Sequence, residues 1–385
     1  MIRFLDLHNF KCFNFAELSL KNLTLVTGKN AAGKSTVLQS LLLLKQSYEM
    51  RYLQDRQLCF SDQLVDLEDY ASTYSNDPDP EDGSFSIIVE DEDEGRWAFS
   101  VDEGTTGGKV MDCHAEWSKP LSECSLFDES MLYLNAERLG PRMSHARKAK
   151  RGRLESRVGD IHGDGAASLF YDSIDKPLLI PGMKHKEGGN DLAGQINAWM
   201  NYILGQDTIL SADANPSTVL LKYGLMNREG VEMQISPTNT AFGHAYVFPI
   251  VVAVMTAPAG SLILLENPEA HLHPAAQVRM GRFLSLAAAN GVQLLVETHS
   301  DHLLNGVRLS VCNRKEWDGG VLSPDLVNIY YFEEDREQVF KHRHREIEID
   351  ETGKLSEWPD GFFDAWEKAL IALHPEIHAD GTVSE

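Results

Sequence analysis

The chain has 385 residues, of which 43% are hydrophobic, enough to fill the core of one large domain or of two ordinary ones. Its 35 basic and 58 acidic residues give a net charge of −23, so the surface as a whole repels polyanions, and a nucleic-acid contact requires a local basic patch. Five scattered cysteines without a Cys-x-x-Cys pair argue for reduced thiols rather than a disulfide framework or a zinc site. Because no secretory signal and no apolar run of membrane-spanning length is visible, we expect a cytoplasmic protein with no membrane contact.

The N-terminal region predicts strands at residues 2–7, 18–20 and 23–26, followed by an apolar helix that begins near Val37. The segment between the last strand and this helix is Gly28-Lys29-Asn30-Ala31-Ala32-Gly33-Lys34-Ser35-Thr36. A glycine-rich loop between a strand and a helix is typical of a phosphate-binding P-loop.

The residue types of this loop suit the binding of ATP together with Mg²⁺. Gly28 and Gly33 let the chain turn and approach a ligand closely, and the backbone N–H groups of the loop and the helix start can surround a polyphosphate. Lys34 supplies a positive charge to the β- and γ-phosphates, and the Ser35 hydroxyl can complete the shell of a Mg²⁺ ion. The predicted ATP-binding residues of the loop are Gly28, Asn30, Gly33, Lys34, Ser35 and Thr36.

The middle of the chain predicts a β-hairpin at 85–101, where two stretches with every other residue apolar flank an acidic run. A buried strand is expected at 131–134, and the segment after it is the most basic part of this acidic chain. Two interpretations of that segment stay open: contact with nucleic acid or another acidic partner, or an exposed loop without a specific role. The residues in question are Arg147, Lys148, Lys150, Arg151 and Arg153.

Farther along, helical spacing at 192–204 and strand patterns at 219–223 and 231–235 precede two buried strands that end in polar residues. The apolar run at 261–265 is followed by Glu266, and the strand at 292–297 by His299. Ligands bind at the carboxyl ends of such strands. We therefore predict that Glu266 holds Mg²⁺ opposite Ser35, and that His299 contacts a γ-phosphate or the attacking water.

Together these motifs resemble the ABC-type ATPase head that is shared by the structural-maintenance-of-chromosomes (SMC), RecF and overcoming-lysogenization-defect (OLD) groups. The resemblance rests on residues 9–11, the P-loop, and the segments 264–274 and 297–301. Within this group the stretches 133–142 and 358–364 look similar to compact bacterial ATPases of anti-phage defence, such as the Septu ATPase subunit. The implied fold is an α/β P-loop NTPase of the ABC-ATPase-head type, with a mixed sheet, a β-hairpin subdomain and an inserted helical arm.

The resemblance also implies a head that dimerises around two ATP molecules, each held by the P-loop of one subunit and the signature motif of the other. Lys11 would correspond to a basic residue near the nucleotide, although a surface lysine is the alternative. The signature would lie at 236–244, with Asn239, Phe242 and Gly243 reaching the partner's nucleotide from the start of an apolar helix. Because the motif departs from the Leu-Ser-Gly-Gly form, a turn that only caps a core helix is the other interpretation.

A second departure concerns hydrolysis. In many such heads a glutamate that activates water follows the strand-end acid, but Asn267 stands at that position here. An amide cannot accept the proton, so either hydrolysis is slow or Glu269 takes over as the base. The predicted catalytic residues are thus Glu266, Glu269 and His299.

We expect one discontinuous ATPase head over residues 1–385. Its parts are a P-loop lobe at 1–60, a β-rich part at 61–135, an inserted basic and helical arm at 136–215, a lobe with the signature, acidic strand and histidine loop at 216–345, and a C-terminal cap at 346–385.

The leading functional hypothesis is a slowly hydrolysing ATPase whose nucleotide-dependent dimer regulates a separate nuclease or toxin effector in anti-phage defence. OLD nucleases carry their nuclease domain after the head, whereas the residues after 346 predict only a short helix at 362–373. Two alternatives are a RecF-like, ATP-dependent DNA-binding clamp in repair and a nucleotide-locked scaffold with negligible turnover.

Overall fold

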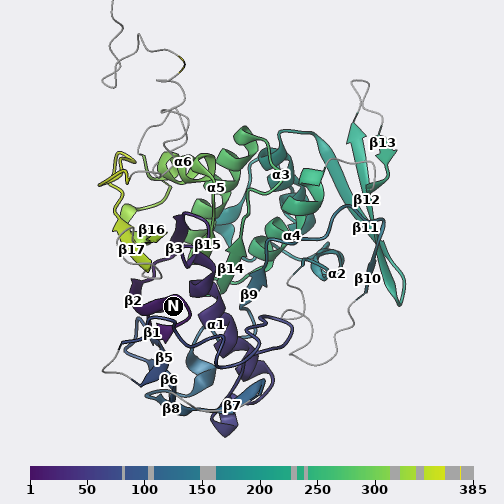
Figure 1. The fold of residues 1–385 in the computed structure, drawn as a ribbon. Helices are drawn as coiled ribbons and strands as arrows, with labels where there is room; N and C mark the ends of the chain where they lie inside the picture. The colour runs from purple at the N-terminus through teal and green to yellow at the C-terminus, as the bar shows by residue number, and fades with distance from the viewer. Residues whose placement is uncertain are drawn as a thin grey trace, which may run out of the picture.

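The computed structural model describes residues 1–79, 83–102, 108–147, 162–226, 232–237, 242–312, 321–334, 342–359 and 373. Two sheets, the helices between and above them, and a projecting arm make up the molecule (Figure 1). Several predicted features lie outside these residues: Asn239, almost all of the helix expected at 362–373, and the basic residues Lys148, Lys150, Arg151 and Arg153.

Six strands form the central sheet, in the order β17–β16–β3–β15–β14–β9. All neighbours are parallel except β16 and β17, which confirms the predicted mixed sheet and places the P-loop strand β3 between β15 and β16. The strands are β3 (Leu23–Gly28), β9 (Leu132–Leu134), β14 (Leu262–Glu266), β15 (Gln293–Glu297), β16 (Val327–Glu334) and β17 (His342–Ile347).

The central sheet is covered on both faces, which explains why its strands are apolar at consecutive positions. In β14, Ile263 and Leu265 belong to a core that includes four long helices, whereas Leu262 and Leu264 belong to a second core built around the P-loop helix. The four helices are α3 (Leu192–Leu204), α4 (Phe242–Thr256), α5 (Pro274–Ala289) and α6 (Asp301–Val311), and the P-loop helix is α1 (Lys34–Glu49). The helix predicted at 192–204 is thereby confirmed.

The N-terminal part is an antiparallel sheet in the order β2–β1–β5–β6–β8, which shares its core with α1. The predicted hairpin is confirmed, since β5 and β6 pair antiparallel with the acidic run at their turn. A short pair, β4 with β7, and the 3₁₀ turns Leu53–Asp55 and Leu121–Glu123 complete this part. The strands are β1 (Ile2–Phe10), β2 (Phe13–Ser19), β4 (Gln57–Cys59), β5 (Ser84–Asp91), β6 (Arg96–Asp102), β7 (Val110–Asp112) and β8 (His114–Trp117).

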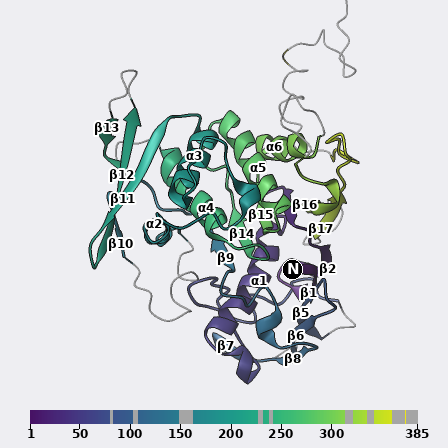
Figure 2. The same ribbon diagram turned by 180° about the vertical axis from the view of Figure 1, so that it is seen from behind.

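The arm is a third, antiparallel sheet that lies at the edge of the molecule farthest from β16 and β17 (Figures 1 and 2). It consists of β10 (Ser144–Ala146), β11 (Thr208–Ala214), β12 (Thr218–Met226) and β13 (Glu232–Ile235), with helix α2 (Ala166–Tyr171) packed against it. Two 3₁₀ turns, Pro181–Met183 and Pro324–Leu326, lie elsewhere in the C-terminal part. Among the described residues, no helix combines the length and the hydropathy needed to cross a membrane.

Candidate nucleotide-binding site

The P-loop leaves the end of β3 and turns into α1 through two positions that only glycine can occupy. Gly28 has φ +135°, and a Cβ there would lie 2.1 Å from the carbonyl oxygen of Phe332 on the neighbouring strand. Gly33, just before α1, has φ +96°, and its Cβ would lie 2.6 Å from the ring of Phe13. Glycine is therefore required at both positions for two reasons: the backbone has a positive φ, and neighbouring atoms leave no space for a Cβ.

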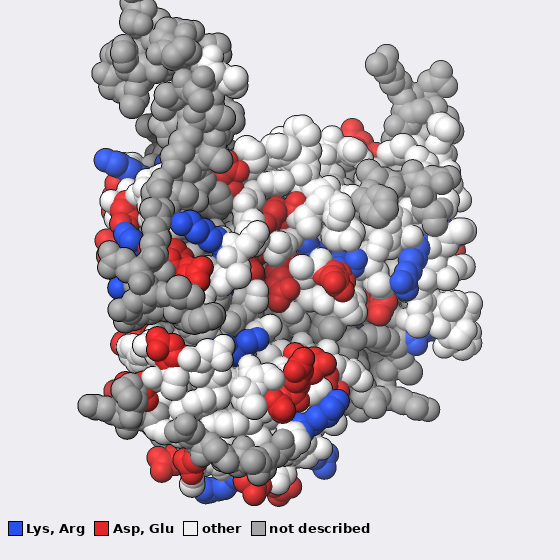
Figure 3. Space-filling model, viewed as in Figure 1, with Lys and Arg blue, Asp and Glu red and all other residues white. Residues whose placement is uncertain are grey.

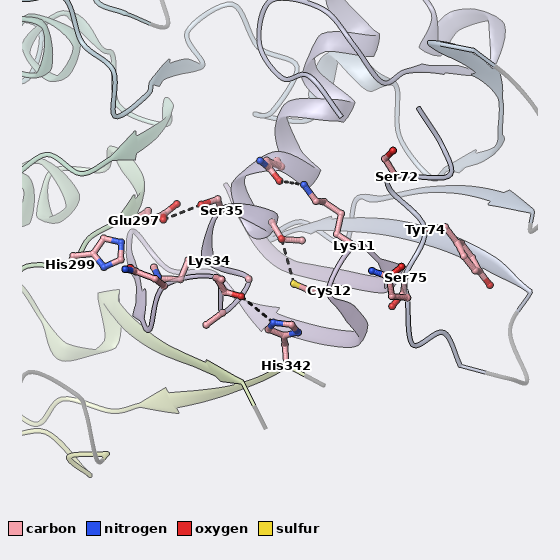
Figure 4. Close-up of a pocket in the computed structure, with 17 residues that line it drawn as sticks. Lys11, Cys12, Lys34, Ser35, Ser72, Tyr74, Ser75, Glu297, His299 and His342 are labelled. Atoms are coloured by element: carbon pink, nitrogen blue, oxygen red, sulfur yellow. Dashed lines mark hydrogen bonds between the residues drawn. The ribbon is translucent and has the colours of Figure 1, made fainter. Parts of the chain in front are cut away.

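A pocket of about 530 Å³ opens over this loop (Figure 4). Glu297 and His299 lie at one end of it, beside Lys34 and Ser35, whereas Tyr74 lies at the opposite end. Of the residues predicted from the sequence, those lining the pocket are Lys11, Asn30, Gly33, Lys34, Ser35, Thr36 and His299. Glu266, Glu269 and Gly243 do not line it.

The pocket contains two buried or half-buried lysines in an otherwise acidic protein. Lys34 is 4% exposed, and its Nζ donates to the carbonyl oxygens of Gly28 (3.1 Å) and Lys29 (2.5 Å). Lys11 Nζ donates to Oε1 of Gln39, 2.7 Å away. Burial lowers the pKa of both lysines, which reflects the cost of keeping an ammonium group away from water. A phosphate would offset that cost for each of them.

Glu297 lines the pocket, and no role was predicted for it from the sequence. Its Oε1 accepts a hydrogen bond of 3.1 Å from the Ser35 hydroxyl, the group expected to bind Mg²⁺. Burial, and secondly the nearby carboxylate of Glu266, raise the pKa of Glu297 to about 7. The signal in the sequence was an acid at the end of a buried strand, whereas the pairing of Glu297 in register with Glu266 is visible only in the structure.

Glu266 itself is held by the segment after β9. The Tyr133 hydroxyl donates to one carboxylate oxygen (2.7 Å) and the backbone N–H of Ala136 to the other (3.2 Å). Arg138, 3% exposed, donates to the backbone carbonyls of Glu266 (2.8 Å) and Asn267 (2.5 Å). Burial lowers the pKa of Arg138 to about 10, so it remains charged at neutral pH. The stretch 133–142 thus fixes the loop after β14.

Glu269 links that loop to the end of β15. One carboxylate oxygen accepts from the Thr298 hydroxyl (2.9 Å) and the other from the backbone N–H of His299 (2.8 Å). With both oxygens engaged, Glu269 is placed to orient His299, and its predicted role as a base has no direct support in this arrangement. Burial, and then the charge of Lys34, lower the pKa of His299, which keeps the imidazole neutral and suited to polarising a phosphate or water.

Two further residues, His342 and Gly243, differ in their relation to the pocket. His342, at the start of β17, lines the pocket and its Nε2 lies 3.1 Å from the carbonyl oxygen of Ala31 in the P-loop. Gly243 lies in the first turn of α4 and is buried, and a Cβ there would meet only ordinary contacts, the nearest being Leu204 at 3.4 Å. Its role as part of a signature motif stays a prediction.

The chemistry of the site suits Mg²⁺ bound together with a nucleotide. Mg²⁺ is usually held by one or two carboxylates plus phosphate oxygens, rather than by a complete protein cage. The described residues contain no group of three or more potential metal-binding side chains, but they bring the Ser35 hydroxyl next to the carboxylate of Glu297, with Glu266 beside it. These residues fit a Mg²⁺ site that depends on a bound nucleotide. There the metal would neutralise part of the charge of the phosphates.

Models of known protein families match three segments of the chain. A model of an AAA ATPase domain matches residues 1–94. An AAA-domain model whose description refers to an AbiEii toxin of a type IV toxin–antitoxin system matches residues 234–305. A family of proteins of unknown function, DUF3696, matches residues 322–373. No curated protein sequence matches the chain.

Solved structures of SMC heads are similar to the chain at low sequence identity. The SMC head bound to the C-winged helix domain of ScpA is 12% identical, with 90% of this chain and 97% of that chain covered and a TM-score of 0.51. The head from Pyrococcus furiosus, bound to the C-terminal domain of ScpA, is 12% identical over 97% and 98% of the chains (TM-score 0.48), and that from Thermotoga maritima is 10% identical over 90% and 99% (TM-score 0.46). Two segments of the chain are therefore similar to AAA ATPase domains, and the chain has the fold of an SMC ATPase head.

Proposed function

We propose that the chain is a slowly hydrolysing ATPase whose nucleotide-dependent dimer regulates a separate nuclease or toxin effector. The proposal rests on the pocket over the P-loop, in which Lys34 and Ser35 lie beside Glu297 at the end of β15. It rests also on Asn267, which follows the neighbouring strand β14 where a water-activating glutamate would stand. Such a site binds ATP well and turns it over slowly, which suits a nucleotide-controlled assembly better than a motor.

Anti-phage defence is the setting that the comparisons support. The model matched at 234–305 refers in its description to a toxin of a toxin–antitoxin system. We extend this setting to the present chain as part of the proposal, together with the resemblance to the Septu ATPase subunit. The SMC heads in the matched structures bind a separate protein, ScpA, which is a precedent for an effector on a head of this fold.

A protein effector is favoured over DNA by the charge distribution. The net charge is −23, and on the face in Figure 3 the basic side chains are scattered among acidic ones. Arg147, the described member of the basic segment, lies over the ring of Tyr171 at 5.3 Å and 3.8 Å from a carboxylate oxygen of Asp172. Its charge is therefore partly satisfied within the protein.

The test compares phosphate release and solution mass, by light scattering, for the wild type and Lys34→Ala, with and without ATP and Mg²⁺. We expect the mass of the wild type to increase with ATP and Mg²⁺, and its turnover to be slower than the roughly 1–10³ s⁻¹ of typical enzymes. Lys34→Ala should neither increase in mass nor release phosphate. Lys222→Ala, an exposed lysine on β12 that pairs with Asp213, is the matched control and should behave like the wild type. An unchanged mass with rapid turnover would contradict the regulatory proposal, and an absence of ATP binding would contradict the whole assignment.

A further inference from the structure

The carboxylate of Glu297 has one oxygen for which the described residues offer no partner. Glu297 is 6% exposed, its Oε1 accepts from Ser35, and its Oε2 is buried without a hydrogen bond. A buried, unsatisfied carboxylate oxygen carries a substantial free-energy cost. The pocket that it lines is the nucleotide pocket, so the natural partner of this oxygen is a group that arrives with the ligand.

The neighbouring carboxylate is in the opposite situation. Glu266 is paired in register with Glu297 at the ends of β14 and β15, so the two acids lie side by side. Both oxygens of Glu266 are engaged, by the Tyr133 hydroxyl and the backbone N–H of Ala136. Two adjacent carboxylates repel each other and attract a cation, and of the pair Glu297 has the oxygen that is available.

The hydrogen bond from Ser35 indicates where that cation binds. A hydroxyl has one hydrogen and two lone pairs, and here the hydrogen is directed to Glu297. The lone pairs of Ser35 are then left for a metal ion, and the same carboxylate that orients the hydroxyl lies beside the ion. Hydrogen bonds of this kind set the orientation of a metal ligand and tune its affinity.

We propose that Glu297 is a magnesium-binding carboxylate of the nucleotide site, in which Oε1 orients the Ser35 hydroxyl and Oε2 supplies an oxygen to the metal or to one of its waters. This inference rests on the proposed binding of ATP with Mg²⁺. It assigns to β15 a role in metal binding in addition to the positioning of His299. The metal site would then be formed at the ends of the neighbouring strands β14 and β15.

The experiment measures metal affinity directly, with Mn²⁺ as a paramagnetic substitute for Mg²⁺. The full chain is saturated with the β,γ-imido analogue of ATP, and free Mn²⁺ is followed by electron paramagnetic resonance in the wild type, Glu297→Gln and Glu333→Gln. We expect Glu297→Gln to weaken Mn²⁺ binding by about 10–100-fold. Glu333 is the last residue but one of β16 in the same sheet and pairs with Arg345 (2.7 Å), so Glu333→Gln should leave Mn²⁺ binding unchanged.

A second measurement separates a metal ligand from a structural role. In the presence of EDTA, Glu297→Gln should bind the nucleotide at least as tightly as the wild type, because the substitution removes a negative charge near the phosphates and glutamine can still accept from Ser35. If Glu297→Gln melts at a lower temperature than the wild type, Glu297→Asp replaces it in both measurements. This substitution keeps the charge but moves it back by one methylene group. The expected result is the same: weaker Mn²⁺ binding, with nucleotide binding in EDTA retained.

Equal Mn²⁺ affinity in Glu297→Gln and the wild type would overturn the proposal, even if hydrolysis were lost. Loss of hydrolysis with unchanged metal affinity would mean that Glu297 acts as a catalytic base. Loss of metal-free nucleotide binding in folded variants would also overturn it, because that pattern belongs to a structural role. If instead the wild type itself binds no nucleotide, the proposed function fails, which is distinguishable from both results.

Discussion

At the scale of single residues, the loop after β14 is held in an uncommon conformation by a buried cation. Asn267 has φ +45°, in the left-handed region, and its carbonyl oxygen accepts a hydrogen bond from Arg138. Asparagine tolerates this region better than most residues. The position at which many such heads have a water-activating glutamate is therefore also a position at which the backbone restricts the choice of residue.

Replacing Asn267 by glutamate should increase ATP hydrolysis. A carboxylate at this position can accept a proton from the attacking water, a contribution of about 10²-fold or more. Asn267→Gln has nearly the same size without a charge and serves as the control, and both substitutions should cost about 1 kcal/mol of stability because of the positive φ. Single-turnover phosphate release at saturating ATP measures the effect, and equal rates in the two variants would show that the base is located elsewhere.

At the scale of elements, His299 depends on how closely α5 and α6 pack. Helix α6 begins at Asp301, directly after the Ser300 cap whose hydroxyl accepts from the backbone N–H of Leu303. The helices approach each other through two glycines. A Cβ on Gly281 would lie 2.2 Å from the carbonyl oxygen of Leu303, and one on Gly306 would lie 2.1 Å from that of Val278. A change in this spacing would move the start of α6 and the histidine before it.

Either Gly281→Ala or Gly306→Ala should therefore destabilise the protein by about 1–3 kcal/mol through overpacking, although alanine is the better helix former. Gly108→Ala is the matched control, because a Cβ there would meet nothing within 4 Å, and its effect should stay within about 0.5 kcal/mol. Urea denaturation curves give the three values. Similar stabilities for all three variants would mean that the helix pair has room to move apart.

Features that depend on local sequence patterns could be predicted from the sequence, whereas contacts between distant residues could not. The P-loop, the strand ending at Glu266 and the hairpin at 85–101 depend on local patterns, and the structure has each of them. The hydrogen bond between Tyr133 and Glu266 joins residues 133 positions apart, and that between Ser35 and Glu297 joins residues 262 apart. Such contacts depend on strand order and register, which a single sequence leaves open. The role of Glu297 therefore emerged only from the arrangement of β14 and β15.

At the scale of the whole molecule, the pocket uses residues from both halves of the chain. Lys11 and the P-loop come from the N-terminal region, whereas His299 and His342 come from strands or loops beyond residue 290. The two cores meet across the central sheet, with α1 on one face and α3 to α6 on the other. Gly243 is buried and does not line the pocket, so the expectation that it contacts the nucleotide of a second subunit stays a prediction.

A mixing experiment tests that expectation. Lys34→Ala removes the P-loop cation, and Gly243→Asp places a negative charge at the N-terminus of α4, where it suits the helix but repels a γ-phosphate. Each variant alone should be inactive. In an equal mixture, the mixed dimers contain one intact composite site, so about a quarter of the wild-type phosphate release should return. Position 243 is buried although a Cβ there meets only ordinary contacts, so a melting curve first has to show that the Gly243→Asp variant folds. An inactive mixture of two folded variants would mean that α4 acts within its own subunit, and the site would then have to close by a movement inside one chain.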